Sequence, residues 1–319
     1  MFLLSLQRSG STLVQRMLAS HPQIATVSEP WVLVPLLYTL RRRGVNAEYG
    51  HRATVSAIDD FMQELPNGRA TYLDELRRTT LRLYRHAAGP EPTHFLDKTP
   101  RYALVVDELV ETFPDATFIV LWRNPLAVVA SIIETWGHGS WNLDEDKVDV
   151  YTGLTRLVDG YARNRDRMHA VRYEDLLDDP RSVTAKMFAH IGLDPREDAA
   201  DEFAGVELRG KMRDPVGVDR YREVSTEPLA KWRSTLDNPF RKAWCRRYLG
   251  IIGADRLAVM GYDIDVLLTD LEETDTSMHR LGSDLFRAGR GFTRTLFETR
   301  LLREQAALLP AAHKIHRHV

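Results

Sequence analysis

The sequence predicts a three-layer α/β fold, with a central parallel sheet between two layers of helices and a helical extension at the C-terminus. Short apolar runs that end at turn residues indicate buried strands near residues 2–6, 94–96, 117–122 and 168–172. Helical spacing follows these runs, and this alternation is typical of parallel sheets covered on both faces. Ligands of such sheets gather at the carboxyl ends of the strands, so we expect the functional residues there.

Composition narrows the class of protein. The chain has 319 residues, of which 44% are hydrophobic and 28% are charged, as is ordinary for a globular protein. Its formal charge of −2 argues against a general nucleic-acid binder. The one cysteine, Cys245, fits a reducing compartment. Met1–Leu4 lacks the positive start of a secretory signal, and no run of 18 apolar residues exists, so we expect a cytoplasmic protein.

The first strand, 2–6, runs through a short turn into a predicted helix at 11–20. Arg8 and Gly10 lie in that turn, and the free amide groups of the helix start point to an anion site. The turn differs from the usual nucleotide P-loop, because Ser11 stands where that motif has lysine. A strand–turn–helix joint without a ligand is the alternative.

A second element repeats this arrangement. The strand at 117–122 ends in Arg123-Asn124-Pro125, and Pro125 suits the first turn of the helix that follows. Arg123 offers a bidentate fork to a phosphate, and Ser131, eight residues later, could donate a hydroxyl to the same group. Taken singly, Arg123 could instead form a surface ion pair and Ser131 could be a neutral helix residue.

Together these two motifs resemble the sulfotransferases that use PAPS (3′-phosphoadenosine 5′-phosphosulfate). Three smaller segments also match the family, and all the matches come in the family's order. The smaller segments are residues 96–100, 171–177 and, more weakly, 229–232. The pattern is similar to that of the tyrosylprotein sulfotransferases and the bacterial group related to them. The resemblance implies a P-loop-like fold, PAPS as donor, PAP (adenosine 3′,5′-bisphosphate) as product, and no metal.

The resemblance also implies a set of cofactor-binding residues and three catalytic ones. The cofactor-binding set is Arg8, Ser9, Gly10, Ser11, Thr12, Leu13, Arg123, Ser131 and Tyr173. The catalytic residues are Glu29 as general base, Lys98 and Arg8.

Glu29 is chosen because it lies 21 residues after Arg8, the distance at which the tyrosylprotein enzymes place a catalytic glutamate. Its alternative role is to stabilise the start of the helix after Pro30. Trp31 stands where those enzymes carry an arginine that holds acidic peptides, which argues against protein-tyrosine sulfation. Lys98 should stabilise charge in the transition state; the alternative is a surface ion pair with Asp97.

His138, in an aromatic and Gly-rich segment, is an alternative base. Residues 208–213 are read either as a loop that covers the cofactor or as a solvated loop.

We predict an α/β domain at 1–265, in which 41–70 is a lid or an insertion, and a helical extension at 266–319. Residues 280–303 alternate arginines with apolar residues. They form either a basic amphipathic helix for a membrane surface or a partner chain, or a helix that packs on the domain.

The predicted function is sulfuryl transfer to a hydroxyl of a small-molecule, carbohydrate or glycolipid acceptor in a bacterium. A magnesium- and ATP-dependent small-molecule kinase and a non-catalytic nucleotide-binding module are the alternatives. A kinase would need a carboxylate at the end of the strand at 117–122 to bind magnesium. Arg123 stands there instead, which argues against the kinase.

Overall fold

The computed structural model describes residues 1–45, 47, 49–196, 198–210 and 224–296. The strands are β1 (Phe2–Ser5), β2 (Ile24–Thr26), β3 (His94–Leu96), β4 (Phe118–Trp122) and β5 (Met168–Arg172). All pair in parallel, in the groups β1-β4-β5 and β2-β3. A parallel bridge between Phe2 and Asp97 joins the two groups, giving the spatial order β2-β3-β1-β4-β5. The predicted parallel sheet is confirmed.

Alternate residues of the strands pack into two separate cores, one on each face of the sheet. Phe2, Leu4 and Val120 belong to the larger core, whereas Leu3 and Ile119 belong to the smaller one. Because successive side chains of a strand point to opposite faces, an uninterrupted apolar strand must be covered twice. This requirement produces the three layers that the sequence predicts.

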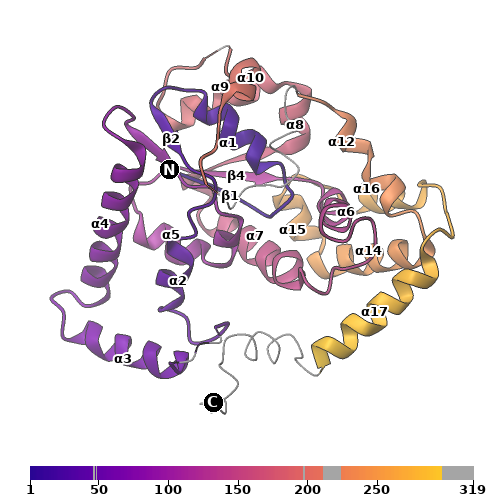
Figure 1. Ribbon diagram of the computed structural model, residues 1–319, viewed down its shortest axis with the longest axis horizontal. Coiled ribbons are helices and arrows are strands. Elements are labelled where there is room, and N and C mark those ends of the chain that lie inside the picture. Colours follow the sequence, from indigo (N-terminus) through magenta and orange to yellow (C-terminus); the bar gives the residue numbers. More distant parts are fainter. Residues whose placement is uncertain (46, 48, 197, 211–223, 297–319) are drawn as a thin grey trace.

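Helices supply both covers (Figure 1). The smaller core is completed by α1 (Ser11–Ala19), α8 (Tyr173–Asp178) and α9 (Pro180–Ile191). The larger core is completed mainly by α5 (Val106–Thr112), α6 (Pro125–Trp136), α7 (Leu154–Arg163) and α14 (Pro239–Ile252).

Further helical segments surround these layers. They are α2 (Leu33–Tyr38), α3 (His51–Gln63), α4 (Arg69–Ala88), α10 (Ala199–Glu202), α12 (Glu227–Ala230), α13 (Trp232–Thr235), α15 (Ala254–Val259), α16 (Ile264–Glu272) and α17 (Leu281–Leu296). Single turns of 3₁₀-helix are η1 (Pro100–Leu104), η3 (Arg165–Arg167) and η4 (Phe203–Gly205), and η2 (Val148–Gly153) is a π-helix.

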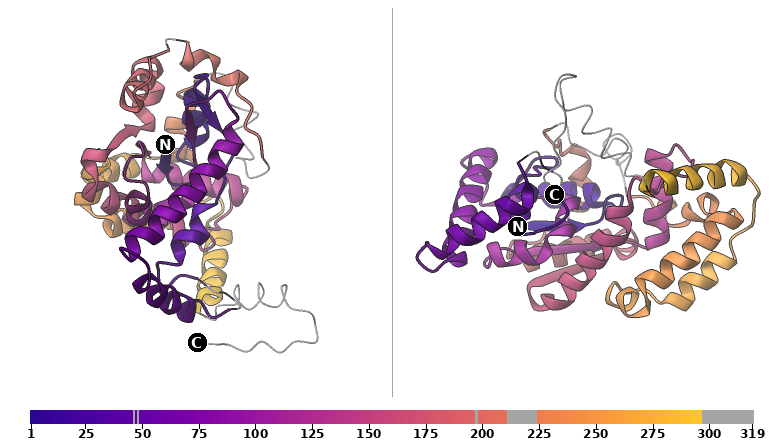
Figure 2. Two further views of the ribbon diagram at one scale, coloured as in Figure 1. Left: turned by 90° about the vertical axis from the view of Figure 1, so that its left-hand side faces the viewer. Right: turned by 90° about the horizontal axis from the view of Figure 1, so that it is seen from below.

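The peripheral helices lie at opposite ends of the molecule. Figures 1 and 2 show α3 and α4 at one end and the C-terminal helices α14 to α17 at the other. Within the predicted lid or insertion at 41–70, α3 buries Val55 and Met62. A role for this segment as a lid stays a prediction.

The predicted boundary after residue 265 falls inside α16. Leu267 and Leu271 of this helix are part of the larger core. The division into a domain and an extension stays a prediction, and residues 297–319 lie outside the described residues. No described helix has both the length and the apolar character needed to cross a membrane.

Candidate active site

The carboxyl edge of the sheet gathers the predicted site residues. Arg8 follows β1, Glu29 follows β2, Lys98 follows β3, Arg123 follows β4, and Tyr173 follows β5. The spatial strand order therefore places them from Glu29 through Lys98, Arg8 and Arg123 to Tyr173. These residues are spread over 166 positions of the sequence, from Arg8 to Tyr173, and they share one edge because parallel strands all end on the same side.

The turn after β1 has an unusual backbone. Arg8 has a φ of 62° and Gly10 a φ of 90°, so both lie in the left-handed region that residues with a Cβ seldom adopt. A Cβ added to Gly10 would lie 2.3 Å from Cε2 of Tyr173, so only glycine lets the ring pack against this turn. Helix α1 then starts at Ser11. The amide of Leu13 donates to the carbonyl of Gly10 at 3.0 Å, whereas the amides of Ser11 and Thr12 precede the hydrogen bonds of the helix.

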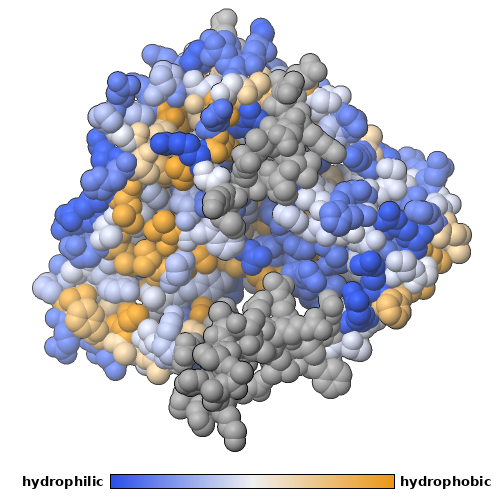
Figure 3. Space-filling model, in the orientation of Figure 1, coloured by the Kyte–Doolittle hydropathy of each residue, from blue (hydrophilic) through white to orange (hydrophobic). Residues whose placement is uncertain are grey.

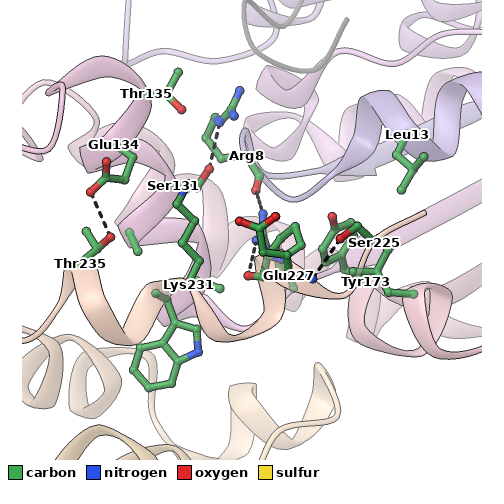
Figure 4. Close-up of a pocket in the computed structure, with 16 residues that line it drawn as sticks. Arg8, Leu13, Ser131, Glu134, Thr135, Tyr173, Ser225, Glu227, Lys231 and Thr235 are labelled. Carbon is green, nitrogen blue, oxygen red and sulfur yellow. Dashed lines mark hydrogen bonds between the residues drawn. The ribbon is translucent and has the colours of Figure 1, made fainter. Parts of the chain in front are cut away.

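Arg8 connects the turn with β4 and α6. Its Nε donates to Oγ of Ser131 at 3.2 Å, and its main-chain carbonyl accepts from Nη1 of Arg123 at 2.7 Å. Figure 4 shows the Arg8 side chain reaching from the turn toward Ser131 on α6. Two arginines 115 positions apart in the sequence are therefore in direct contact.

Arg123 is a buried cation with several partners. It is only 8% exposed, and its guanidinium carbon lies 4.6 Å from the centre of the Tyr173 ring. Its Nη2 donates to the carbonyl of Pro228 at 3.4 Å, while Nε is buried without a hydrogen-bond partner among the described residues. The alternative of a surface ion pair is wrong, because Arg123 is buried and its described hydrogen-bond partners are main-chain carbonyls.

Five of the nine predicted cofactor-binding residues line one cleft. They are Arg8, Leu13, Arg123, Ser131 and Tyr173. Ser9, Ser11 and Thr12 are buried in the turn and the start of α1, beside Gly10.

The opposite wall of the cleft comes from residues 225–235. Glu227, Lys231 and Trp232 line it, and Thr235 donates to Glu134 of α6 at 3.0 Å (Figure 4). The weak sequence match at 229–232 thus lies at the same cleft.

Glu29 and Lys98 form a pair of their own. Nζ of Lys98, a residue only 2% exposed, donates to Oε1 of Glu29 at 2.7 Å. The indole nitrogen of Trp31 donates to Oε2 at 3.1 Å. Both carboxylate oxygens of Glu29 therefore have a donor, although neither residue is among the described residues that line the Arg8–Arg123 cleft.

The alternative roles of these two residues are not realised. Helix α2 begins at Leu33 without an acidic residue in its first turn, so Glu29 does not stabilise that start. Asp97 accepts hydrogen bonds from Tyr84, from Tyr102 at 2.8 Å and from Thr99 at 3.0 Å, and Lys98 is paired elsewhere. Burial raises the pKa of Asp97, while these three hydroxyl donors lower it.

Glu29 itself lines a shallow groove with Val27, Ser28, His86, Ala87, Arg209 and Gly210. The main-chain carbonyl of Arg209 accepts from the amide of Ser28 at 2.8 Å, so residues 208–210 lie beside the end of β2. The rest of the predicted covering loop, 211–213, lies outside the described residues.

His138 is exposed and is not among the described residues lining the cleft. Its carbonyl accepts from Arg280 at 3.1 Å. Its role as an alternative base stays a prediction. Over the described ranges, no three His, Cys, Asp or Glu side chains gather in a way that could hold a metal ion.

Sequence reasoning missed Gln15, which is fully buried in α1. Its Nε2 donates to Oγ1 of Thr26 at 2.8 Å and to the carbonyls of Val27 at 2.7 Å and Ser28 at 3.3 Å. These bonds fix the segment that leads to Glu29. The signal in the sequence is weak: Gln15 is a polar residue that directly follows the apolar residues Leu13 and Val14 of the helix.

Comparison with known proteins decides the family. The model of the "Sulfotransferase family" matches residues 1–198, more than half of the chain. This chain belongs to the sulfotransferase family. The family model covers all five strands and every predicted catalytic and cofactor-binding residue.

Two relatives of this sulfotransferase-family protein come from bacteria. Nodulation protein NoeE of Sinorhizobium fredii is 31% identical over 290 residues, covering 82% of this chain. Omega-hydroxy-beta-dihydromenaquinone-9 sulfotransferase Stf3 of Mycobacterium tuberculosis is 29% identical over 133 residues, covering 38% of this chain. The alignments span 65% of the length of NoeE and 34% of that of Stf3.

Among solved structures, the sulfotransferase domain from the curacin biosynthetic pathway aligns with 73% of this chain and 90% of its own. The identity is 21% and the TM-score is 0.49.

Proposed function

We propose that this protein transfers a sulfuryl group from PAPS to a hydroxyl group of an acceptor. The observation that carries the proposal is the contact between Arg8, Ser131 and Arg123 in one cleft at the carboxyl edge of the sheet. Two guanidinium groups and a hydroxyl are the donors that phosphate groups bind best.

The residues present fit such a cofactor. Arg123 keeps a buried Nε without a described partner, and a buried donor of this kind is costly unless a ligand satisfies it. The first turn of α1 presents further amides beside Gly10. When bound, PAPS would supply the sulfuryl group; Arg123 and Ser131 would hold its 3′-phosphate, and residues 9–13 its 5′-phosphate.

Glu29 is the proposed base. Its carboxylate takes the proton of the acceptor hydroxyl as negative charge builds on that oxygen. Lys98 and Trp31 hold the carboxylate in place, and the buried ammonium of Lys98 also offers positive charge to the reacting group. Arg8 points to Ser131 here, so its own catalytic role remains a proposal.

The acceptor is proposed to be a small molecule, a carbohydrate or a glycolipid that carries the reacting hydroxyl. The name of Stf3 describes a hydroxylated menaquinone as the acceptor of that relative, which supports a hydroxyl here. We also propose a cytoplasmic location, which the single cysteine of the chain supports.

Replacing Glu29 tests the reaction and the base together. Labelled PAPS is incubated with an extract of the source organism and with wild-type protein, Glu29→Gln, or Glu64→Gln as an exposed control. We expect labelled sulfate on an acceptor with wild type and control. Glu29→Gln should lower the rate by about 10²–10⁴-fold, because general base catalysis contributes that much.

Thermal stabilisation by PAP and by ATP with magnesium separates the alternatives. PAP should raise the melting temperature of wild type and of Glu29→Gln equally. Stabilisation by ATP with magnesium but not by PAP would favour a kinase. Binding of PAP without any transfer would favour a binding module, and full activity of Glu29→Gln would remove Glu29 as the base.

A further inference from the structure

Buried polar contacts attach helix α17 to the rest of the protein. Asp284 is fully buried and accepts from Nε of Arg241 at 2.7 Å and from Nδ2 of Asn238 at 2.8 Å. It also accepts from the amide of Trp141 at 3.2 Å. An amphipathic helix usually turns its apolar face to the domain. Here an ion pair occupies the side that faces inward.

The apolar side chains of α17 point outward as a consequence. Leu285 is 52% exposed, Phe286 71% and Phe292 67%. With a rotation of about 100° per residue, these three lie on one broad side of the helix, whereas Ala288 and Gly291 lie on the side of Asp284. Ala288 packs against the larger core, and Gly291 is buried next to Asp144. The apolar side of α17 is therefore exposed.

Positive charge accompanies this exposed side. Arg290 follows Phe286 by one turn of the helix and is exposed, and Arg287 is partly exposed. Residues 280–319 contain eight Lys and Arg against three Asp and Glu, a formal charge of +5. The other 279 residues contain 35 against 42, a formal charge of −7. Figure 3 shows apolar residues beside strongly polar ones at the right-hand edge, over α17.

The positive charge of this segment indicates which kind of partner could bind the exposed side of α17. A second copy of the chain docked through the same helix would bring positive charge against positive charge, because Leu281–Leu296 contains three arginines and one aspartate, a formal charge of +2. Residues 297–319, with four Lys and Arg against two Asp and Glu, would also add positive charge. A surface of anionic phospholipids supplies the opposite charge and an apolar layer for the aromatic side chains.

We propose that the outward side of α17, defined by Leu285, Phe286, Phe292 and Arg290 with Arg287 at its edge, docks the protein on an anionic phospholipid surface. Helices of this kind lie in the plane of the membrane interface and insert only their apolar side. Asp144 lies on the inward side of α17, so its carboxylate does not face that surface. The proposal is independent of sulfuryl transfer, because it requires no catalysis.

Vesicle flotation of the full-length protein tests the proposal. Vesicles of phosphatidylcholine alone are compared with vesicles that also contain phosphatidylglycerol. We expect binding to the anionic vesicles at low salt, weakened by added salt, and affinity for phosphatidylcholine vesicles lower by roughly tenfold or more. Equal binding to both vesicle types, or no binding to either, would overturn the proposal.

Three variants assign the contact to α17. The triple variant Leu285→Ser, Phe286→Ser, Phe292→Ser and the double variant Arg287→Gln, Arg290→Gln should each reduce binding by roughly tenfold. The matched control Phe61→Ser, Leu83→Ser removes exposed apolar residues elsewhere and should bind like wild type.

Unchanged thermal unfolding of the triple variant shows that its fold is intact. Sedimentation equilibrium supplies a further readout. A wild-type dimer that the triple variant abolishes would assign the surface to a second copy and overturn the lipid proposal.

Discussion

Arg8 shows how one residue couples the two ends of the proposed nucleotide site. Its positive φ of 62° costs about 1–2 kcal/mol for a residue with a Cβ. That conformation aims its carbonyl at Arg123 while its side chain reaches Ser131. The contact between the two arginines is therefore held by the backbone of the turn, and such preorganisation favours phosphate recognition.

Asp149 provides a prediction on pH at the residue scale. Its carboxylate, next to Gln7 and Arg101, is buried in η2. Burial, the largest cause of the shift, raises the pKa of Asp149 to about 6; Arg101 lowers this pKa and nearby Asp146 raises it, and both effects are included in that value. The unfolded chain releases this proton near pH 4, so the folded state holds it more tightly, and stability falls as the pH rises from about 4 to 6.

Asp149→Asn should remove this dependence. Relative to the variant, wild type should lose about 2–3 kcal/mol of unfolding free energy between pH 4 and pH 7. Urea unfolding of both proteins across this range measures the difference. A difference between the two proteins that does not change with pH would contradict the assignment.

At the scale of elements, Gln15 connects α1 with the strands that carry the proposed base and its partner. Its amide holds residues 26–28, and Oγ1 of Thr26 donates onward to the carbonyl of Leu96 at 2.7 Å. Glu29 follows Ser28 directly, and Lys98 follows Leu96 by two residues. The helix that starts at the proposed phosphate loop thus also sets the position of the proposed catalytic pair, Glu29 and Lys98.

Gln15→Leu should separate the positioning of Glu29 and Lys98 from the binding of the nucleotide. The change leaves the carbonyls of Val27 and Ser28 without the amide donor, which costs about 1–3 kcal/mol of stability. We expect a lower kcat for sulfate transfer with little change in the affinity for PAP, because the Arg8–Arg123 contacts remain. Urea unfolding, kcat and PAP titration check this, with the exposed Gln23→Leu as control. Loss of PAP affinity without a fall in kcat would contradict the positioning role.

The elements near the sheet could be predicted because their signals are local. Apolar runs define β1, β4 and β5, and Arg8, Arg123 and Tyr173 follow at their ends. Partners across the fold could not be predicted, since Lys98 pairs with Glu29, 69 positions away, rather than with neighbouring Asp97. For the same reason the pattern at 280–303 predicts an amphipathic helix but not its orientation, which the contact between Asp284 and Arg241 sets.

At the scale of the whole molecule, the site is divided along the edge of the sheet. The side of β4 and β5 carries the arginine cleft, and the side of β2 carries the Glu29–Lys98 pair with its own groove. PAPS bound in the cleft and an acceptor molecule that enters from the side of β2 would meet at the carboxyl end of β1, next to Arg8. The proposed use of PAPS therefore depends on one claim: Arg123 and Ser131 recognise a 3′-phosphate.

Calorimetric titration with PAP and with adenosine 5′-monophosphate tests that claim most directly, because the two ligands differ only in the 3′-phosphate. Wild type and the surface control Arg181→Gln should bind PAP more tightly by roughly ten- to a hundredfold, as charged hydrogen bonds provide. Arg123→Gln, and to a smaller degree Ser131→Ala, should narrow this preference while binding of the monophosphate persists. Equal affinity of wild type for the two nucleotides would contradict the account.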